Sequence, residues 1–495
     1  MKSVLTDGRL GTLPSPTLVE HVNAVELSNE LATAEHFVLI DLAHALMLTQ
    51  QRVFDPAQGR VIVAALLQLI EGNPQEALAG DPEIGTITLQ IERYLEEECG
   101  PAGLDIQRAR SRIDQNATGL RMADRQGALT VMSELIDLGE ALLAAAQRYD
   151  DVLAPGYTHL QHAQPTTLGH YFNAHYWPLS RNLARLSQVY ERLNECPLGG
   201  AAHSGTSWPI DRDATAAYLG FDRPVRNARD AGMSSVDIGA ELAGALGLTL
   251  SGISRCASDL FYWSSSEVGM VRLDPSLCGT SSMMPQKRNP IVLERIRGLA
   301  GDAAGWGASQ LGILHFATST DSDQAYVHNR IPAYCQATAG AVSLLTEAVT
   351  TLEVHPRRLG ESAGRHWSTS SALADDLVRA QGLSYRGAHE AVARLITAHE
   401  SAGATDGVVR ADLIDQHFRH YSAEELSSIL DTRTFVESRT SAGGTSATQR
   451  RKLAAQAADD LRDHRRIVAA RVKEVEQAQV RLLHDAKALT EEYGT

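Results

Sequence analysis

The chain has 495 residues, of which 43% are hydrophobic, 21% charged and 5% aromatic. This length is sufficient for two or three domains and a large core. The formal net charge of −15 argues against a general nucleic-acid or anionic-membrane binder, because such proteins need a positive surface field. A site for an acidic substrate therefore has to concentrate its few cations locally.

Cysteine usage and the N-terminal segment indicate a cytoplasmic protein. The five cysteines are scattered and form no C-x-x-C pair, so they suggest neither a disulfide framework nor a zinc site. The N-terminal residues lack the continuous apolar core of a signal peptide. The longest apolar run, Val61 to Ile70, is too short to cross a bilayer, so we expect no membrane partner.

The chain is predicted to be helical along most of its length. An irregular arm is expected up to about residue 20, where Gly and Pro are frequent, followed by short amphipathic helices over 25–98 with breaks at 55–56 and 72–74. Apolar residues three or four apart predict a long helix over 238–263, and similar patterns occur at 127–149, 165–195 and 290–313. A final helical part begins near 360 and ends in a charged, solvent-exposed helix over 453–489.

The predicted helix over 238–263 contains four glycines, each of which costs about 1 kcal/mol relative to Ala in a helix interior. Their presence indicates close helix–helix packing, and the surplus of apolar helix surface suggests self-association. We therefore predict an all-α chain with three domains and a long central helical bundle. The expected domain limits are 1–105, 106–360 and 361–495.

The most informative stretch is 279–290, which reads G-T-S-S-M-M-P-Q-K-R-N-P. Small residues and serines followed by a lysine, an arginine and an asparagine predict a flexible loop that holds a hydroxyl beside cations. This combination suits removal of a proton next to a carboxylate and stabilisation of the resulting anion. A plain surface loop would explain a lone Ser-Ser pair, but not twelve residues in this order.

Two other segments offer groups for binding and proton transfer. Residues 155–167 read P-G-Y-T-H-L-Q-H-A-Q-P-T-T and provide the hydroxyl of Thr158 and the imidazole of His159. Residues 110–118 read R-S-R-I-D-Q-N-A-T, where Ser111 and Arg112 suit a carboxylate ligand. Taken alone, the histidine would more often be structural and the arginines would be surface charges.

Together these segments resemble the motifs of the fumarase/aspartase superfamily, whose members eliminate fumarate from succinyl compounds. The wording M-P-Q-K-R-N-P is closest to the argininosuccinate lyase branch. Further similar segments are P-L-G-G-A at 197–201, A-L-A-D-D-L-V at 372–378, and Arg439 with G-G-T at 443–445. The resemblance therefore extends from about residue 80 to 450.

The resemblance implies a carbon–nitrogen lyase of this fold, a homotetramer in which three subunits build each active site. It implies Ser281 as general base, and Lys287 and Asn289 as holders of the carboxylate charge. It also implies that His159, paired with Glu294, protonates the leaving nitrogen or organises a proton relay to it. Ser111, Arg112, Thr158 and Gln324 would bind the small dicarboxylate substrate. No metal or organic cofactor is expected, since P-loop, dinucleotide and H-E-x-x-H motifs are absent.

The chain departs from the argininosuccinate lyase pattern on one side of the expected site. Thr86 and Thr88 replace the Asp and His that serve the arginine end of the substrate. Ile113 replaces an Asn and cannot make the hydrogen bond of an amide. Around 318–326 the family's Tyr is absent, and no Lys follows Gln324. The sequence therefore matches the family's motifs better at the residues that bind the succinyl half of the substrate than at those that bind the guanidino amino acid.

These observations favour a lyase that releases fumarate from an N-substituted aspartate whose amine is not arginine. One alternative is an authentic argininosuccinate lyase of arginine biosynthesis with a diverged pocket. Another is a non-catalytic structural homologue, with Ile113 marking the loss of activity. The retention of all five expected catalytic and charge-holding residues favours an enzyme: Ser281, Lys287, Asn289, His159 and Glu294.

Overall fold

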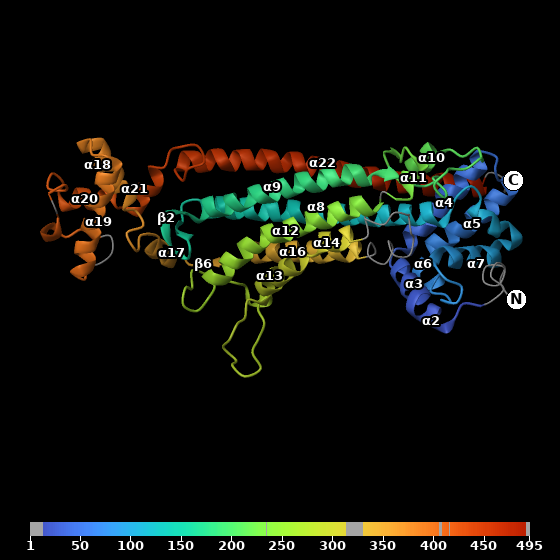
Figure 1. Ribbon diagram of the computed structural model, residues 1–495, viewed down its shortest axis with the longest axis horizontal. Helices are drawn as coiled ribbons and strands as arrows, with labels where there is room; N and C mark the ends of the chain where they lie inside the picture. The colour runs from blue at the N-terminus through green and yellow to red at the C-terminus, as the bar shows by residue number, and fades with distance from the viewer. Residues whose placement is uncertain (1–12, 234, 313–329, 405–407, 415, 492–495) are drawn as a thin grey trace.

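The computed structural model of the protein describes residues 13–233, 235–312, 330–404, 408–414 and 416–491. The molecule is elongated, with a central bundle of long helices and a cluster of shorter helices at each end (Figure 1). The described strands form three two-stranded sheets. The predicted all-α architecture is confirmed.

The N-terminal cluster has breaks where the sequence predicts them. Asp55 caps α5 by accepting hydrogen bonds from Ala57 N and Gln58 N, and Asn73 caps α6. The expectation of an irregular arm up to residue 20 was wrong for its last part, which is already helical. The elements are α2 (Pro16–Leu18), the π-helix η1 (Val19–Asn23), α3 (Ala24–Leu31), α4 (Ala34–Gln50), α5 (Pro56–Glu71), α6 (Pro74–Ala77), α7 (Ile87–Cys99) and the 3-10 helix η2 (Gly100–Gln107).

Helix α4 is the exception to the amphipathic pattern expected for this region. Fourteen of its seventeen residues are buried, including Asp41 and His44. The cause is its position, because α5, α6, α7, α8 and α22 all contact it. A helix enclosed by neighbours has no solvent face, so its sequence lacks the apolar stripe of a surface helix.

The central bundle is built from the long helices that the periodicity predicts. Its core contains fully buried leucines from different helices, such as Leu135, Leu183, Leu246 and Leu293. Two of the predicted helices differ: the one over 127–149 begins earlier, at Arg112, and the one over 290–313 is interrupted at 304–305, with residue 313 outside the described residues. The helices are α8 (Arg112–Arg148), α9 (Leu168–Leu193), α12 (Ser235–Trp263), α13 (Ile291–Ala303), α14 (Trp306–Leu311) and α16 (Ile331–Thr350).

Helix α12 is long and apolar enough to cross a bilayer, but it is packed inside the bundle. A Cβ atom added at Gly247 would lie 2.9 Å from the carbonyl oxygen of Ala303 at the end of α13. This glycine therefore allows the close helix approach that the sequence predicts. At Gly244 an added Cβ would meet open space, although Gly307 of α14 approaches its backbone.

Short strands and turns connect the bundle helices. The hairpin of β1 (Leu153–Thr158) and β2 (Gln161–Thr167) links α8 to α9, and β5 (Val271–Arg272) pairs with β6 (Glu353–Val354). After β5 and η3 (Pro275–Leu277), a long loop projects from the side of the bundle before α13 begins (Figure 1). The other connecting elements are β3 (Glu195–Cys196), α10 (Arg212–Tyr218), β4 (Arg223–Pro224) and α11 (Ala228–Ala231).

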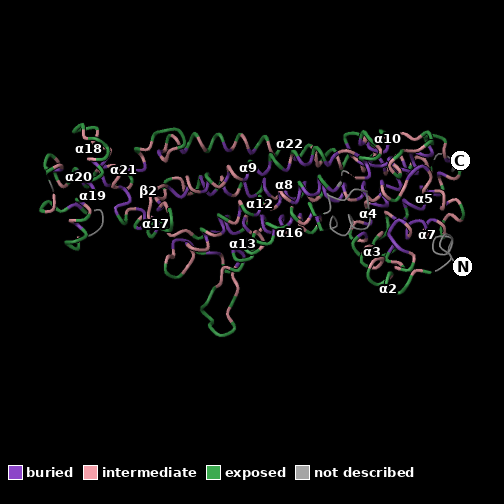
Figure 2. The backbone as a smooth tube through the Cα atoms, viewed as in Figure 1, coloured by how far each residue is buried: buried purple, intermediate pink, exposed green. Residues whose placement is uncertain are grey.

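The C-terminal part ends in the predicted helix, α22 (Ala447–Glu491), which begins six residues earlier than expected. It runs back along α8 and α9, and its outward face is exposed (Figures 1 and 2). Leu482 and Ala486 near its end belong to the N-terminal core. The preceding elements are α17 (Pro356–Ala363), α18 (Ser371–Gln381), α19 (Tyr385–Ser401), η4 (Ala411–Leu413), α20 (Ala423–Ile429) and α21 (Thr432–Glu437). The three domain limits remain a prediction.

Candidate active site

The loop that carries the serine motif is closed at its base by a pair of backbone hydrogen bonds. Gly279 N donates to Asn289 O at 2.8 Å, and Asn289 N donates to Gly279 O at 2.9 Å. Lys287 N donates to Met284 O at 3.1 Å, which forms a turn inside the loop. The loop is therefore a defined structure that places its residues on one projecting unit.

Ser281 is the residue whose environment within this loop is most informative. Its Oγ accepts hydrogen bonds from two backbone groups, Met284 N at 3.0 Å and Met283 N at 3.3 Å. Two N–H dipoles aimed at one oxygen stabilise negative charge on it and so favour loss of the hydroxyl proton. The arrangement suits an oxygen that has to act as a base.

The other predicted residues of this segment lie on the same unit. Lys287 is exposed, Asn289 is half-buried at the loop base, and Glu294 is exposed in the first turn of α13. Nearby, burial raises the pKa of the Cys278 thiol, so this thiol stays protonated. Met283 at the loop tip is 86% exposed, an unusual environment for a large apolar side chain.

His159 lies at the tip of the β1–β2 hairpin, next to Thr158. His159 and Leu160 have φ values of 56° and 57°, between the paired residues Thr158 and Gln161. Positive φ at two central residues is the geometry of a type I′ turn, which normally favours Asn and Gly. Such a conformation in bulky residues stores strain, which is common at functional positions.

The hairpin is attached to the C-terminal part of the chain along one side. His162 Nε2 contacts Ser362 Oγ of α17 at 2.9 Å, and the rings of His162 and His366 lie 4.7 Å apart. His162 therefore has a structural environment, whereas His159 is exposed. The two histidines of this motif therefore differ in exposure and in contacts.

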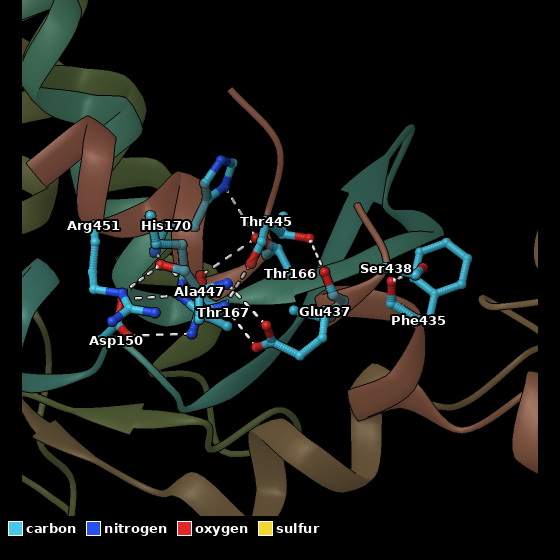
Figure 3. A network of polar contacts seen from close by, with 12 residues as sticks. Asp150, Thr166, Thr167, His170, Phe435, Glu437, Ser438, Thr445, Ala447 and Arg451 are labelled. Carbon is cyan, nitrogen blue, oxygen red and sulfur yellow. Dashed lines mark hydrogen bonds and ion pairs between the residues drawn. The ribbon is translucent and has the colours of Figure 1, made fainter. Parts of the chain in front are cut away.

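A polar network fixes the base of the same hairpin. Arg450 of α22 is buried and donates to Asp150, which precedes β1, and to Glu437 at the end of α21. Figure 3 shows Asp150, Thr166 and His170 facing Glu437 and Thr445 in this network. Burial would raise the pKa of Glu437, but hydrogen bonds from Ala447 N and Arg450 lower it overall. The network thus joins an ionised Glu437 to the hairpin base.

The third predicted cluster is at the opposite end of α8. Ser111 is the N-cap of this helix, and its N–H donates to Asp114 Oδ1 at 2.9 Å. Asp114 Oδ2 accepts from Gly199 N and Ala201 N at 2.8 and 2.9 Å. The fold therefore brings the 110–118 and 197–201 motifs together, through a carboxyl whose pKa is raised by burial.

The two arginines of this cluster differ. The side chain of Arg110 is fully buried and forms an ion pair with Asp41 at 2.5 Å, so it supports the fold. Arg112 is exposed on the first turn of α8. The two arginines therefore differ in burial, and ligand binding by Arg112 stays a prediction.

Ile113 has a neighbour that the sequence analysis did not single out. A Cβ atom added at Gly232 would lie 2.9 Å from Ile113 Cγ2 and 2.8 Å from His203 Cε1, so all three residues are close. Nδ1 of His203 is buried without a hydrogen-bond partner. The only signal in the sequence was an isolated histidine in a Gly-rich loop.

A cavity of about 380 Å³ lies one helical turn after Ile113. Glu30 supplies a carboxylate to its wall. Glu30 Oε2 accepts a hydrogen bond at 2.7 Å from the backbone N of Ile87, the residue between Thr86 and Thr88. Those two threonines are buried and joined through their hydroxyls at 2.9 Å. The cavity is lined by Ser28, Asn29, Glu30, Ala32, Thr33, Phe37, Asn116, Gly119, Leu120, Ala123, Pro332, Ala333 and Gln336.

Within one chain the three clusters do not meet. Helix α8 has 37 residues and is therefore about 55 Å long, and it separates Ser111 from the hairpin. No hydrogen bond or ion pair joins His159 to Glu294 in the described part of the chain. Gln324 lies outside the described residues. The described ranges also contain no group of three or more His, Cys, Asp or Glu that could hold a metal ion.

Comparison with known proteins identifies matches over most of the chain. Residues 13–305 match the family model Lyase, and residues 367–437 match the model Argininosuccinate lyase C-terminal. The argininosuccinate lyase of Methanoculleus marisnigri is 34% identical over 445 residues, which cover 89% of each chain. That of Methanothrix thermoacetophila is 36% identical over 447 residues, or 89% of this chain and 90% of the relative.

Solved structures of lyases are also similar to this chain over most of its length. A crystal structure of EDDS lyase in complex with formate has 30% sequence identity, a TM-score of 0.85 and 97% coverage of both chains. The fumarate lyase from Mesorhizobium sp. BNC1 has 20% identity and a TM-score of 0.70, covering 89% of this chain and 98% of its own. The second likeness shows the fold alone.

The Arg450 network makes a prediction about stability. Arg450→Met should destabilise the protein by about 1–3 kcal/mol, since it leaves partly buried carboxylates and the Thr445 carbonyl without their donor. The lowered pKa of Glu437 means that its contribution is present above its ordinary value of 4.5 and is lost as the pH falls through the folded-state pKa. The free energy of unfolding, measured as a function of pH, should therefore differ between variant and wild type, and this difference should shrink as the pH falls below the folded-state pKa of Glu437.

The matched control is Arg451→Met, the next residue of α22. Arg451 is exposed, and its Nε donates to the backbone oxygen of Ala447 in its own helix. We expect its effect to stay within about 0.5 kcal/mol. Equal losses in the two variants would contradict the assigned role of Arg450.

Proposed function

Since the chain belongs to the argininosuccinate lyase branch of the fumarase/aspartase superfamily, and is a carbon–nitrogen lyase that releases fumarate, we propose that it cleaves an N-substituted aspartate whose amine is not arginine. The observation that supports this proposal is the cavity lined by Glu30 and Asn116: Glu30 accepts a hydrogen bond from Ile87 N, between Thr86 and Thr88, and Asn116 lies one helical turn after Ile113. Thr86, Thr88 and Ile113 are the positions at which the chain departs from the pattern for the guanidino end of the substrate.

The described walls of the cavity favour a compact amine. They offer the carboxylate of Glu30 and the buried, unpartnered Oδ1 of Asn116, beside the ring of Phe37. A guanidinium carries five N–H donors and would leave several of them unsatisfied there, at about 1–3 kcal/mol each. An ammonium group with a short apolar substituent needs fewer acceptors. EDDS lyase, a structural relative at 30% identity, is named for a substrate other than argininosuccinate.

In the proposed mechanism Ser281 is the general base. Its Oγ, activated by the N–H groups of Met283 and Met284, takes a proton from Cβ of the substrate. The electron pair left on Cβ is delocalised into the adjacent carboxylate, where Lys287 and Asn289 stabilise the anion. Formation of the Cα–Cβ double bond expels the nitrogen, which accepts a proton from His159. The products are fumarate and the free amine.

We further propose that subunits of a homotetramer share each active site. A rigid helix of about 55 Å separates Ser111 and Arg112 from His159, so one chain cannot bring them to one substrate. The exposed tips of both projecting units carry apolar side chains, Met283 at 86% and Leu160 at 66% exposure. Such side chains are typical of surfaces covered by a neighbouring subunit. Glu294 of one subunit would then pair with His159 of another.

The two alternatives are weaker. A non-catalytic homologue would have no need for two backbone donors on Ser281, and an authentic argininosuccinate lyase would need more acceptors around Glu30. Cytoplasmic location, independence of cofactors and the lack of nucleic-acid or membrane partners stay as predictions from the sequence.

The role of Ser281 is tested by Ser281→Ala. Elimination from the true substrate should fall on the order of 10³-fold, because the variant lacks the oxygen that removes the proton. The ultraviolet absorbance of fumarate measures the rate. Ser282→Ala is the matched control, since the adjacent hydroxyl is exposed, and it should leave kcat within a few-fold of wild type. Similar rates for the two variants would refute the mechanism.

The identity of the amine is tested in the reverse direction by a panel of amines with fumarate. Compact amines should exceed arginine in kcat/KM by about 100-fold or more, since discrimination of this size follows from unsatisfied polar groups. Glu30→Gln should lower kcat/KM for the preferred amine while still accepting the hydrogen bond of Ile87 N; Glu35→Gln on the neighbouring helix should not. A kcat/KM on the order of 10⁴ M⁻¹s⁻¹ for argininosuccinate would make the proposed substrate class wrong.

Shared active sites are tested by mixing two inactive variants. Ser281→Ala and His159→Asn subunits, unfolded and reassembled together, should recover about a quarter of the wild-type activity if each site takes these residues from different subunits. Each variant carried alone through the same procedure is the control. No recovery, with hybrid tetramers present, would place both residues of a site on one subunit.

A further inference from the structure

A second cavity of about 720 Å³ lies between α8, α9 and α22, and none of the proposed catalytic residues lines it. Two close helix contacts lie beside it. In one, a Cβ atom added at Gly169 would lie 2.5 Å from Ala146 O, so α9 crosses α8 with no intervening side chain. In the other, Leu461 packs against Gly139. The volume is typical of a site for a small organic molecule.

The wall of this cavity contains a buried donor without an acceptor. Asn173 is 5% exposed, and its Oδ1 accepts from Trp177 Nε1 at 3.3 Å. The Nδ2 group of the same amide is buried and has no hydrogen-bond partner. Leaving such a donor unsatisfied is unfavourable. An acceptor atom supplied by a ligand would remove this penalty.

The charges around the cavity favour an anion. Four arginines line it, Arg450, Arg451, Arg462 and Arg465, against two carboxylates, Glu140 and Asp150. Three of these arginines have carboxylate partners: Arg450 pairs with Asp150 and Glu437, Arg462 with Asp459, and Arg465 with Glu140. The guanidinium of Arg451 has only a contact from its Nε to the backbone of its own helix. In a chain with a net charge of −15, this local excess of cations is a marked feature.

The remaining lining residues are mostly apolar. Leucine and alanine side chains from α8 and α22 line the cavity. An anion that is small and fully polar would leave this surface in contact with water. An anion with an apolar body would remove this surface from water, which is favourable. These side chains are Leu143, Ala144, Ala146, Leu453, Ala454, Ala458 and Leu461.

We propose that this cavity binds an amphipathic monocarboxylate. The carboxylate accepts a hydrogen bond from Asn173 Nδ2 and is balanced by the arginines of α22, while the apolar body lies between α8 and α22. The site is separate from the amine cavity at the other end of α8. Its wall includes Asp150 and Gly169, which flank the catalytic hairpin on either side.

The test is calorimetric titration of the assembled full-length protein with decanoate. We expect saturable binding of one molecule per subunit, at least about 10-fold tighter than binding of decanol, which has the same chain without the charge. Asn173→Leu and Arg451→Gln should each weaken decanoate binding several-fold, and Ala458→Phe, which fills the cavity, should abolish it. Arg466→Gln is the matched control for loss of one arginine of α22, because Arg466 is exposed and does not line the cavity.

The proposal is wrong if decanoate does not bind, if decanol binds equally well, or if Ala458→Phe binds like the wild type. Thermal unfolding of each variant shows whether it is folded. Should Asn173→Leu fail to fold, Ala458→Phe and Arg451→Gln decide the result. Because binding is measured directly, failure of the proposed lyase substrate would leave this outcome unaffected.

Discussion

The unbroken length of α8 is the constraint on which the organisation of this protein depends. Every interior residue of an α-helix is held by hydrogen bonds one turn away, so a 37-residue helix behaves as a rod. Ser111 caps one end and the hairpin with His159 follows the other. No rotamer change can bring these groups to one substrate, and cooperation between chains becomes a geometric requirement of the proposed chemistry. In the proposed mechanism, a single chain is folded around its cores but lacks a complete active site.

Some parts of the proposed site are held by contacts within one chain, and others are exposed in the single chain. The loop with Ser281 supplies its own backbone donors and closes its own base, so the electronic environment of the oxygen is set locally. The hairpin is likewise held by contacts within the chain, to α17 and to Arg450. Substrate enclosure, by contrast, is left to surfaces that are exposed in the single chain. Because the Ser281 loop and the hairpin are each held locally, the surfaces around them can change. Such changes could alter which amine is released while the elimination chemistry is retained.

Local features of the sequence predicted the fold well where neighbours along the chain determine the outcome. The periodicity over 238–263 corresponds to α12, and Asp55-Pro56 marks the start of α5, because capping and helix pitch are local properties. The burial of α4 was not predictable in this way, since it results from elements distant in sequence. The hairpin at 153–167 carried a recognisable motif but no alternating pattern. The cavity around Glu30 and Asn116 joins segments up to 300 residues apart, and no short-range pattern marks such an assembly.

The course of α22 has a consequence for how the protein is made. Leu482 and Ala486 fill part of the N-terminal core, although every other segment of that core precedes α22 in the sequence. The N-terminal helices therefore wait for the synthesis of α22 before their apolar surface is fully covered. During translation this surface is available to chaperones or to aggregation. A nascent chain that stops before α22 would therefore lack part of the hydrophobic core of its N-terminal helices.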